Sequence, residues 1–162
     1  MKLRRATLDD LDRIAQTEAI CFPEAEAATR ESLRDRLTRY PHHFLLLEDG
    51  ETLVGFINGP VVRSEHLSDD MYENAAVHDE AGSWQMIFGL DVIPSRRNRG
   101  CAALLLRRMI DDAREQGRRG LVLTCKESLV PYYAGFGFRD EGISESVHGG
   151  AVWHEMRLTF PA

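Results

Sequence analysis

The sequence predicts a mixed α/β protein of the α+β kind, with a mostly antiparallel sheet of about seven strands and about four helices. Two β-rich runs are separated by Asp49-Gly50, and this dipeptide between such runs indicates a β-hairpin. The run Gly120–Cys125 is continuously apolar, as is typical of a strand covered on both faces. Between them, Gln85–Ala113 combines an apolar strand, a short basic turn and an amphipathic helix. Together these observations favour a sheet covered by helices.

The predicted strands are runs of β-favouring residues bounded by turn-forming residues. Gly59-Pro60 marks the end of one of them, or a bulge in it, and His148-Gly149-Gly150 supplies the last turn. In chain order the strands are Lys2–Ala6, Phe44–Glu48, Thr52–Val61, the opening of Gln85–Ala113, Gly120–Cys125, Phe136–Gly142 and Ala151–Phe160.

The predicted helices follow start and stop signals as well as apolar spacing. Thr7 is placed as an N-cap, with Asp10 three residues on, close to a capping box; this helix ends near Cys21. A helix over Thr29–Tyr40 ends at Pro41. The remaining helices are the second half of Gln85–Ala113, Leu129–Gly135 and a short one around Ser68–Asn74, within the polar loop Arg63–Ser83.

Length and composition limit the classes to which the protein can belong. We expect one domain spanning residues 1–162, because the chain has 162 residues, 43% hydrophobic and 28% charged. A net charge of −6 argues against nucleic-acid binding and mildly favours cationic partners. No signal peptide or membrane span is expected, and the three separated cysteines fit neither a disulfide framework nor a zinc site. A cytoplasmic monomer or homodimer without a metal is therefore expected.

The basic turn inside Gln85–Ala113 is a candidate anion site. Arg96, Arg97 and Arg99 stand at the start of a helix, where free backbone N–H groups and the helix dipole both favour negative charge. This arrangement in an acidic protein predicts that the turn holds a phosphorylated cofactor, to which the rest of the chain presents a second substrate.

Three segments resemble the GNAT acetyltransferases. Arg97–Ala102 (RNRGCA) matches their Q/R-x-x-G-x-G/A loop, and Leu90–Pro94 matches their fourth strand. Leu129–Phe138 (LVPYYAGFGF) matches their Y…GF segment. The similarity is greatest to the arylalkylamine (serotonin) N-acetyltransferase branch, where it extends to Tyr40-Pro41, to the hairpin and to Thr124–Pro131.

The resemblance implies a GNAT fold, splayed between its fourth and fifth strands, that transfers an acetyl group from acetyl-CoA to an amine by direct attack in a ternary complex. Tyr133 occupies the position of the tyrosine beside the CoA sulfur and would be the general acid. The implied cofactor-binding residues are Leu90, Asp91, Val92, Arg97, Asn98, Arg99, Gly100, Cys101, Ala102, Leu129 and Tyr132.

The chemistry of amine acetylation makes three demands. The amine must lose a proton, the developing oxyanion needs a donor, and the departing thiolate needs a proton. The phenol of Tyr133 can supply the last, and a backbone N–H near Leu90 can supply the second. In the arylalkylamine branch two histidines relay the amine proton, but here Met86 and Phe88 stand at those positions. We expect them to line an apolar acceptor site together with Phe22.

Because these histidines are missing, the sequence does not identify the base that removes the proton from the amine. It is a titrating side chain or ordered water, and His148 is singled out because the loop before the last strand borders the acceptor site in this family. The other candidates are Glu24, Glu26, Asp69, Asp70, Asp91 and Glu127.

The sequence thus favours an enzyme that acetylates a small primary amine with acetyl-CoA and without a metal. The alternatives are acetylation of a protein N-terminus, a lysine or a polyamine, a CoA-binding regulator without catalysis, and a phosphate-ligand protein of another family.

Overall fold

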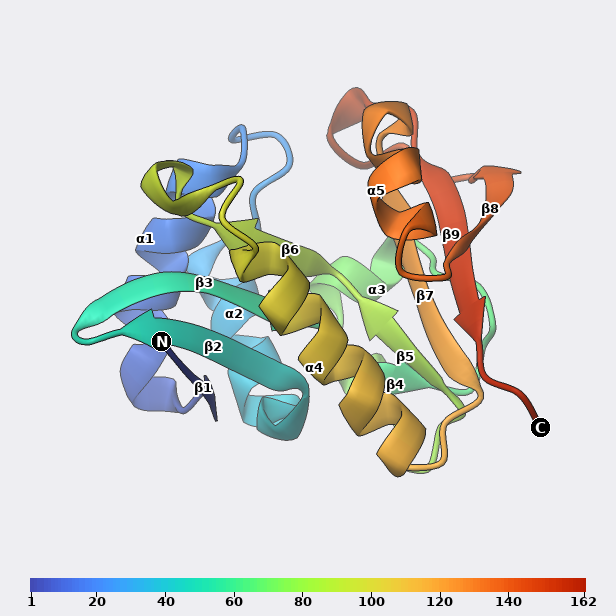
Figure 1. Ribbon diagram of the computed structural model, residues 1–162, viewed down its shortest axis with the longest axis horizontal. Coiled ribbons are helices and arrows are strands. Elements are labelled where there is room, and N and C mark those ends of the chain that lie inside the picture. The colour runs from blue at the N-terminus through green and yellow to red at the C-terminus, as the bar shows by residue number, and fades with distance from the viewer.

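Nine strands and five α-helices follow one another in the predicted order in the computed structural model, which describes residues 1–162 (Figure 1). The helices are α1 (Leu11–Cys21), α2 (Arg30–Arg39), α3 (Asp70–Glu73), α4 (Cys101–Glu115) and α5 (Val130–Ala134). The strands are β1 (Lys2–Arg5), β2 (Phe44–Asp49), β3 (Thr52–Asn58), β4 (Val61–Val62), β5 (Trp84–Ile87), β6 (Gly89–Val92), β7 (Gly120–Cys125), β8 (Arg139–Ile143) and β9 (His154–Thr159).

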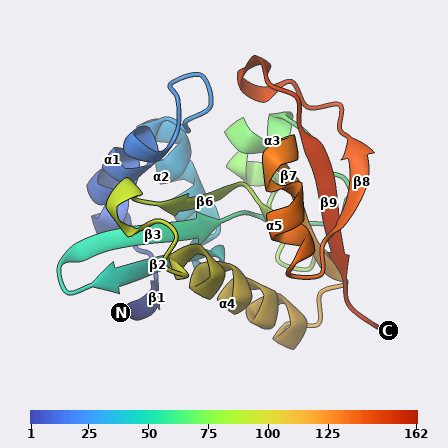
Figure 2. The ribbon, with the colours of Figure 1, turned by 45° about the horizontal axis from the view of Figure 1, so that its top comes forward.

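The strands form two sheets that separate at Phe88. One sheet has the order β1-β2-β3-β6 and the other the order β4-β5-β7-β9-β8. Every pairing is antiparallel except that of β5 with β7. β5 pairs with β7 as far as Ile87, whereas β6, which begins at Gly89, pairs with β3 instead. The chain therefore leaves β7 at Phe88, which opens the splay expected between the central strands (Figure 2).

The predicted fold class is confirmed, and two expected strands are each divided. The run Thr52–Val61 breaks into β3 and β4 at Gly59-Pro60, and the fourth expected strand breaks into β5 and β6 at Phe88. A Cβ on Gly59 would lie 1.9 Å from the carbonyl oxygen of Met86, so the backbones approach too closely for any other residue. Pro60 has no N–H to donate, which ends the ladder there.

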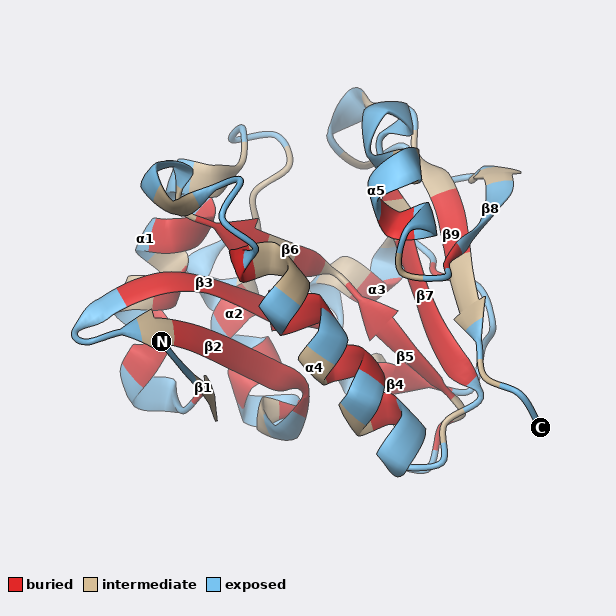
Figure 3. Ribbon diagram, in the orientation of Figure 1, coloured by how far each residue is buried: buried red, intermediate tan, exposed pale blue.

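Helices cover opposite faces of the first sheet because its residues alternate. Leu45, Leu47 and Ile57 pack with α4, whereas Leu46 and Phe56 pack with α1 and α2. Figures 1 and 3 show α4 crossing one face with its buried side turned to the strands. This period of two is the signal from which strands are predicted, and here both faces are buried.

The predicted hairpin turn and the predicted capping interaction before the first helix are both found. Gly50, with φ +61°, forms the turn between β2 and β3. Asp10 accepts the N–H of Thr7 at 2.9 Å, and a single 3-10 turn over Leu8–Asp10 precedes α1. None of the helices has the length and apolarity needed to cross a membrane.

Candidate active site

Two adjoining cavities lie where the sheets separate. The first, about 550 Å³, is bounded by aromatic side chains and is called here the aromatic cavity. The second, about 510 Å³, lies against the basic turn before α4 and is called the loop cavity. They share five wall residues, so the cavities meet at one junction. The shared residues are Cys21, Phe22, Leu90, Leu129 and Tyr133.

The loop cavity ends in a cluster of free backbone N–H groups. Asn98 and Gly100 have positive φ angles of 60° and 81°, which turn the chain sharply into α4. The first backbone hydrogen bond at this helix end runs from the Leu104 N–H to the Gly100 carbonyl at 3.1 Å, so the N–H groups of residues 98–103 have no backbone acceptor. No acidic residue lies in the first turn, and Arg96 and Arg97 line the cavity. The arrangement fits an anion such as a pyrophosphate.

Strand β6 offers a free backbone edge to the junction. The Val92 carbonyl accepts the Cys21 thiol at 3.4 Å and the Arg97 Nε at 2.9 Å, so it points away from β3. Because ladder groups alternate along a strand, the N–H and C=O of Leu90 point the same way. An extended ligand with amide groups can pair with this edge.

Tyr133 stands at the junction of the two cavities. Helix α5 carries it, and it is largely buried. Burial, and then the neighbouring Cys125 and Tyr132, raises the pKa of Tyr133 above its ordinary value of 10. The phenol is therefore protonated at neutral pH and available as a donor.

The aromatic cavity is walled by three segments that are distant in sequence. Phe22 follows α1, Tyr72 belongs to α3, and His148 and Trp153 belong to the loop before β9. The ring of Tyr72 stacks on that of His148, with centroids 4.9 Å apart, and tilts against Phe88 at 4.5 Å. These rings give the cavity the apolar faces that an aryl or alkyl group needs.

Carboxylates outnumber cations in this cavity. Lys126 forms an ion pair with Glu26 at 2.8 Å, and Arg36 bonds to the Asn58 side chain and the Tyr72 carbonyl. Three further acids, Glu31, Asp35 and Glu73, stand exposed at the rim. The rim is therefore negative and suits a cationic ligand.

Most of the predicted site residues line one of the two cavities. Those that do are Phe22, Phe88, Leu90, Val92, Arg97, Asn98, Gly100, Cys101, Ala102, Leu129, Tyr132, Tyr133 and His148.

Three predicted site residues lie outside the cavity walls. Met86 is fully buried in a cluster with Trp84 and Val122, because the break at Phe88 turns β5 away from the cavity. The side chain of Arg99 is exposed in the basic turn. Asp91 is buried on the face of β6 that α1 covers.

The structure gives the candidate bases different surroundings. The Nε2 of His148 lies 2.9 Å from the Glu26 carbonyl, which engages that ring nitrogen as a donor. Asp69 accepts the Val147 N–H at 3.0 Å and so ties α3 to the loop before β9. Glu24 is exposed and lines neither cavity.

The structure adds Glu18, a buried acid that is not among the site residues predicted from the sequence. Glu18 lines the aromatic cavity from α1. A signal for it exists, because position 18 follows Ile14 by four residues and Leu11 by seven, on the apolar stripe of the helix. An acid on such a stripe must meet a partner or a ligand.

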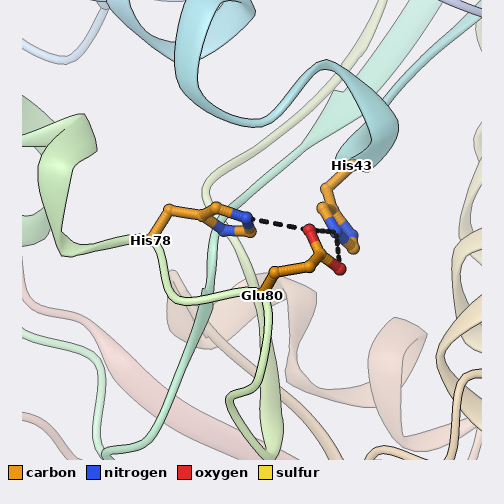
Figure 4. Close-up of side chains that lie close together, drawn as sticks. All are labelled: His43, His78 and Glu80. Carbon is orange, nitrogen blue, oxygen red and sulfur yellow. Dashed lines mark hydrogen bonds and ion pairs between the residues drawn. The ribbon is translucent and has the colours of Figure 1, made fainter.

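A second polar cluster lies away from both cavities. His43, His78 and Glu80 point toward one another, with the Nε2 atoms of both histidines 3.0 Å from the Glu80 carboxylate (Figure 4). The Arg118 guanidinium occupies the other side of that carboxylate at 2.6 Å. The Nδ1 of His78 accepts the Val61 N–H at 3.0 Å, which fixes the ring proton on Nε2. A metal would need that nitrogen unprotonated and would meet the guanidinium, so the donor set does not fit a metal site.

The sequence signature of the acetyltransferase (GNAT) family matches residues 8–138. The chain belongs to this family. Serotonin N-acetyltransferase of Mesocricetus auratus is 29% identical over 130 residues, which cover 80% of this chain and 61% of the relative. The match thus spans about three fifths of that relative's length. The resemblance to the family found in the sequence is confirmed, and the serotonin N-acetyltransferase match supports the similarity to the arylalkylamine branch.

Solved structures of low sequence identity share the fold over nearly the whole chain. The loading GNATL domain of CurA from Lyngbya majuscula superposes with a TM-score of 0.85 at 15% identity, covering 98% of this chain and 96% of that one. The GphF GNAT-like decarboxylase, solved with isobutyryl-CoA, gives 0.81 at 22% identity, with 98% and 99% covered. These likenesses confirm the GNAT fold.

Proposed function

We propose that the protein is an acetyl-CoA-dependent N-acetyltransferase that acetylates a small primary amine by direct attack in a ternary complex. The observation that carries this proposal is the junction of the two cavities at Tyr133, with an anion-binding helix start on one side and an aromatic, acid-rimmed cavity on the other. Membership of the GNAT family supports acetyl transfer, and the relative named above is a serotonin N-acetyltransferase. Residues 1–162 would act as one domain that binds both substrates.

The loop cavity suits acetyl-CoA. The N–H groups of residues 98–103 and the side chain of Arg97 would hold its pyrophosphate. The free edge at Leu90 would pair with the amides of the pantetheine arm, while Leu129 and Tyr132 line the same cavity beside that path. The thioester supplies an activated acetyl group, which this arrangement brings to the junction with the aromatic cavity.

Two groups at the junction meet the demands of the transfer. The Leu90 N–H, which points away from β3, would donate to the oxygen that becomes negative during attack. The Tyr133 hydroxyl, protonated because burial raises its pKa, would give its proton to the departing sulfur.

The aromatic cavity favours a small cationic amine with an aryl or alkyl body. Its rings offer apolar and π faces, and the rim acids attract an ammonium group before it loses its proton. A cavity of about 550 Å³ is of the size that encloses a small molecule. Protein N-termini, lysines and polyamines are the alternative acceptors.

The test is an acetyl-CoA consumption assay over a chemically diverse panel of amines, including arylalkylamines, polyamines, amino acids and short peptides. We expect turnover to be fastest with arylalkyl or alkyl monoamines. If a peptide or a polyamine is acetylated fastest, that compound class replaces the small monoamine as the proposed acceptor. Binding of acetyl-CoA by calorimetry without turnover of any amine would indicate a CoA-binding regulator instead.

A further inference from the structure

The side chain of Lys126 connects two walls of the aromatic cavity. Lys126 follows β7, and its Nζ reaches the carboxylate of Glu26 in the loop after α1, at 2.8 Å from Oε1 and 3.1 Å from Oε2. The same ammonium lies 5.8 Å from the centre of the Trp153 ring, in the loop before β9. All three residues line the cavity. A carboxylate and an indole face therefore hold an alkylammonium group in the acceptor cavity.

The site that holds this ammonium is built by contacts that do not involve Lys126. The Glu26 side chain is 10% exposed, and a Cβ on Gly149 would lie 2.6 Å from its Cγ, so the loop before β9 packs closely on it. The Glu26 carbonyl accepts the Nε2 of His148 at 2.9 Å, and the Nε1 of Trp153 donates to the His148 carbonyl at 2.8 Å. Figure 2 shows the two loops approaching each other. We therefore expect the carboxylate and the ring to keep their positions when the lysine is replaced.

The other acids that line the cavity do not offer the same place to a cation. Glu18 accepts the Ala28 N–H with its Oε2, and its Oε1 is buried. The remaining acids are exposed to water at the rim, and they are Glu31, Asp35 and Glu73. An ammonium group that passes the rim therefore finds the sheltered carboxylate of Glu26 already occupied by Lys126.

Lysine is a rare cation in this chain. Lys126 and Lys2 are the only lysines among the 20 lysine and arginine residues. A lysine ends in a compact ammonium on a flexible alkyl stem, which is the group that a small primary amine also carries. Lys126 thus fills the place that the second ammonium of a diamine would take. Its side chain is 46% exposed, so the ion pair adds little to the stability of the fold.

We propose that Lys126 is a specificity-determining residue, which makes the acceptor cavity select monoamines over diamines and polyamines. The inference rests on the proposed function and deepens it by assigning a single positive charge to the acceptor. The second ammonium of a diamine either lies against the apolar rings, where it loses its hydration without a partner, or displaces Lys126 from Glu26. Displacement exchanges one ammonium for another and brings no net gain. A monoamine meets neither cost.

The experiment compares Lys126→Met with Lys126→Arg. Methionine keeps an unbranched apolar side chain and frees Glu26, whereas arginine keeps a cation that pairs with a carboxylate and stacks on an aromatic ring. Lys2→Met, at the other lysine, lies outside both cavities and is the matched control. The substrates are unbranched alkylamines and α,ω-diamines of matched carbon number, and kcat/KM is measured for each pair at one ionic strength.

The wild type, Lys2→Met and Lys126→Arg should all favour the monoamine. In Lys126→Met, the ratio of kcat/KM for the diamine to that for the monoamine should rise about tenfold, in line with the strength of a sheltered cation–π contact. The rise should be greatest at one chain length, because Glu26 lies at a fixed place in the cavity. It should vanish in the double variant Lys126→Met/Glu26→Gln, which lacks the carboxylate.

Calorimetry gives a readout that does not need turnover. CoA carries no acetyl group, so the protein saturated with CoA binds amines without reacting. Under these conditions Lys126→Met should bind the best-fitting diamine about tenfold more tightly than the wild type does, whereas Lys2→Met should bind it with wild-type affinity.

The outcomes separate this inference from the proposed function. A wild type that binds acetyl-CoA but acetylates no amine overturns both. An active wild type that prefers the diamine of a matched pair overturns the inference alone, as does a Lys126→Met variant that keeps the wild-type selectivity and diamine affinity. A gain that is equal at every chain length reflects only the changed charge of the cavity, and a gain that persists in the double variant places the second ammonium away from Glu26. Either of these results also overturns the inference.

Discussion

The Nε2 of His43 lies 3.0 Å from both carboxylate oxygens of Glu80, and its Nδ1 faces the Gln85 Oε1 at 2.9 Å. The amide nitrogen of Gln85 donates to the carbonyls of Gly59 and Met86, which leaves its oxygen as the acceptor for His43. The ring of His43 is thus held at both nitrogens. The Glu80 carboxylate links His43, which follows α2, to Arg118, which follows α4.

Loss of the Glu80 carboxylate should destabilise the fold without affecting either cavity. Glu80→Gln removes charged hydrogen bonds to two histidines and to Arg118, but the Glu80 side chain is itself 61% exposed, so the free energy of unfolding should fall by about 0.2–1 kcal/mol. Urea unfolding measures this, with the exposed Glu65→Gln as the control. Zinc should not raise the unfolding midpoint of the wild type, and a rise that Glu80→Gln abolishes would contradict the conclusion that His43, His78 and Glu80 do not form a metal site.

An acid network at the N-terminus predicts a pH dependence of stability. Asp10, with a side chain 7% exposed, accepts bonds from Arg4, Arg13 and the Thr7 N–H. Burial opposes its charge, but the hydrogen bonds from Arg4 and Thr7 prevail and lower the pKa of Asp10 well below 3.8. Because the folded pKa is the lower one, the stabilisation is complete above the unfolded value and is lost as pH falls toward the folded value.

Asp10→Asn should therefore cost about 2–3 kcal/mol at pH 7, and its difference from wild type should shrink below about pH 4. Urea unfolding at a series of pH values gives both quantities. Asp12→Asn, at a side chain 77% exposed, is the control and should change stability by less than about 1 kcal/mol. A difference between Asp10→Asn and wild type that persists undiminished at pH 3 would exclude this account.

The parts predictable from the sequence were those fixed by local backbone chemistry. The Asp49-Gly50 hairpin, the cap at Asp10 and the strand–turn–helix at Gln85–Ala113 depend on neighbouring residues, and all three are found. The alternation along β2 predicted a strand, and packing adds that both of its faces are covered.

The features that the sequence did not predict depend on contacts between residues far apart in the chain. The break at Phe88 depends on which strand each half of the segment pairs with, so Met86 turns into the core while Phe88 faces the cavity. Glu18 and Asp91 are far apart in the sequence. They come close together only because α1 packs on β6. Periodicity assigns a side chain to a face but does not say which acid lies opposite it.

Gly100 should be required for acetyl-CoA binding because its conformation aims the N–H groups before α4. Its φ is +81°, and a Cβ there would meet nothing within 4 Å, so alanine strains the backbone without a clash. Gly117, at the other end of the same helix, has φ +78° and is equally open, which makes Gly117→Ala a matched control. Both variants should lose about 1–2 kcal/mol of stability. Calorimetry should show about tenfold weaker acetyl-CoA binding for Gly100→Ala only, and equal affinities would remove the helix start from the proposed cofactor site.

Tyr133→Phe should separate chemistry from binding. The ring keeps its contacts with Tyr132 and Phe138 at the junction, so the fold and the acetyl-CoA affinity should be retained. Loss of the hydroxyl leaves the thiolate without its donor, and kcat should fall about 10²-fold. Because burial raises the pKa of Tyr133 above 10, the wild-type kcat should show no alkaline loss from this phenol in the range where common amines titrate. Steady-state kinetics across pH, with calorimetry on the same samples, measures both effects. A variant that keeps the wild-type kcat would show that the sulfur is protonated by another group, and one that loses acetyl-CoA binding would make Tyr133 a residue of the cavity wall alone.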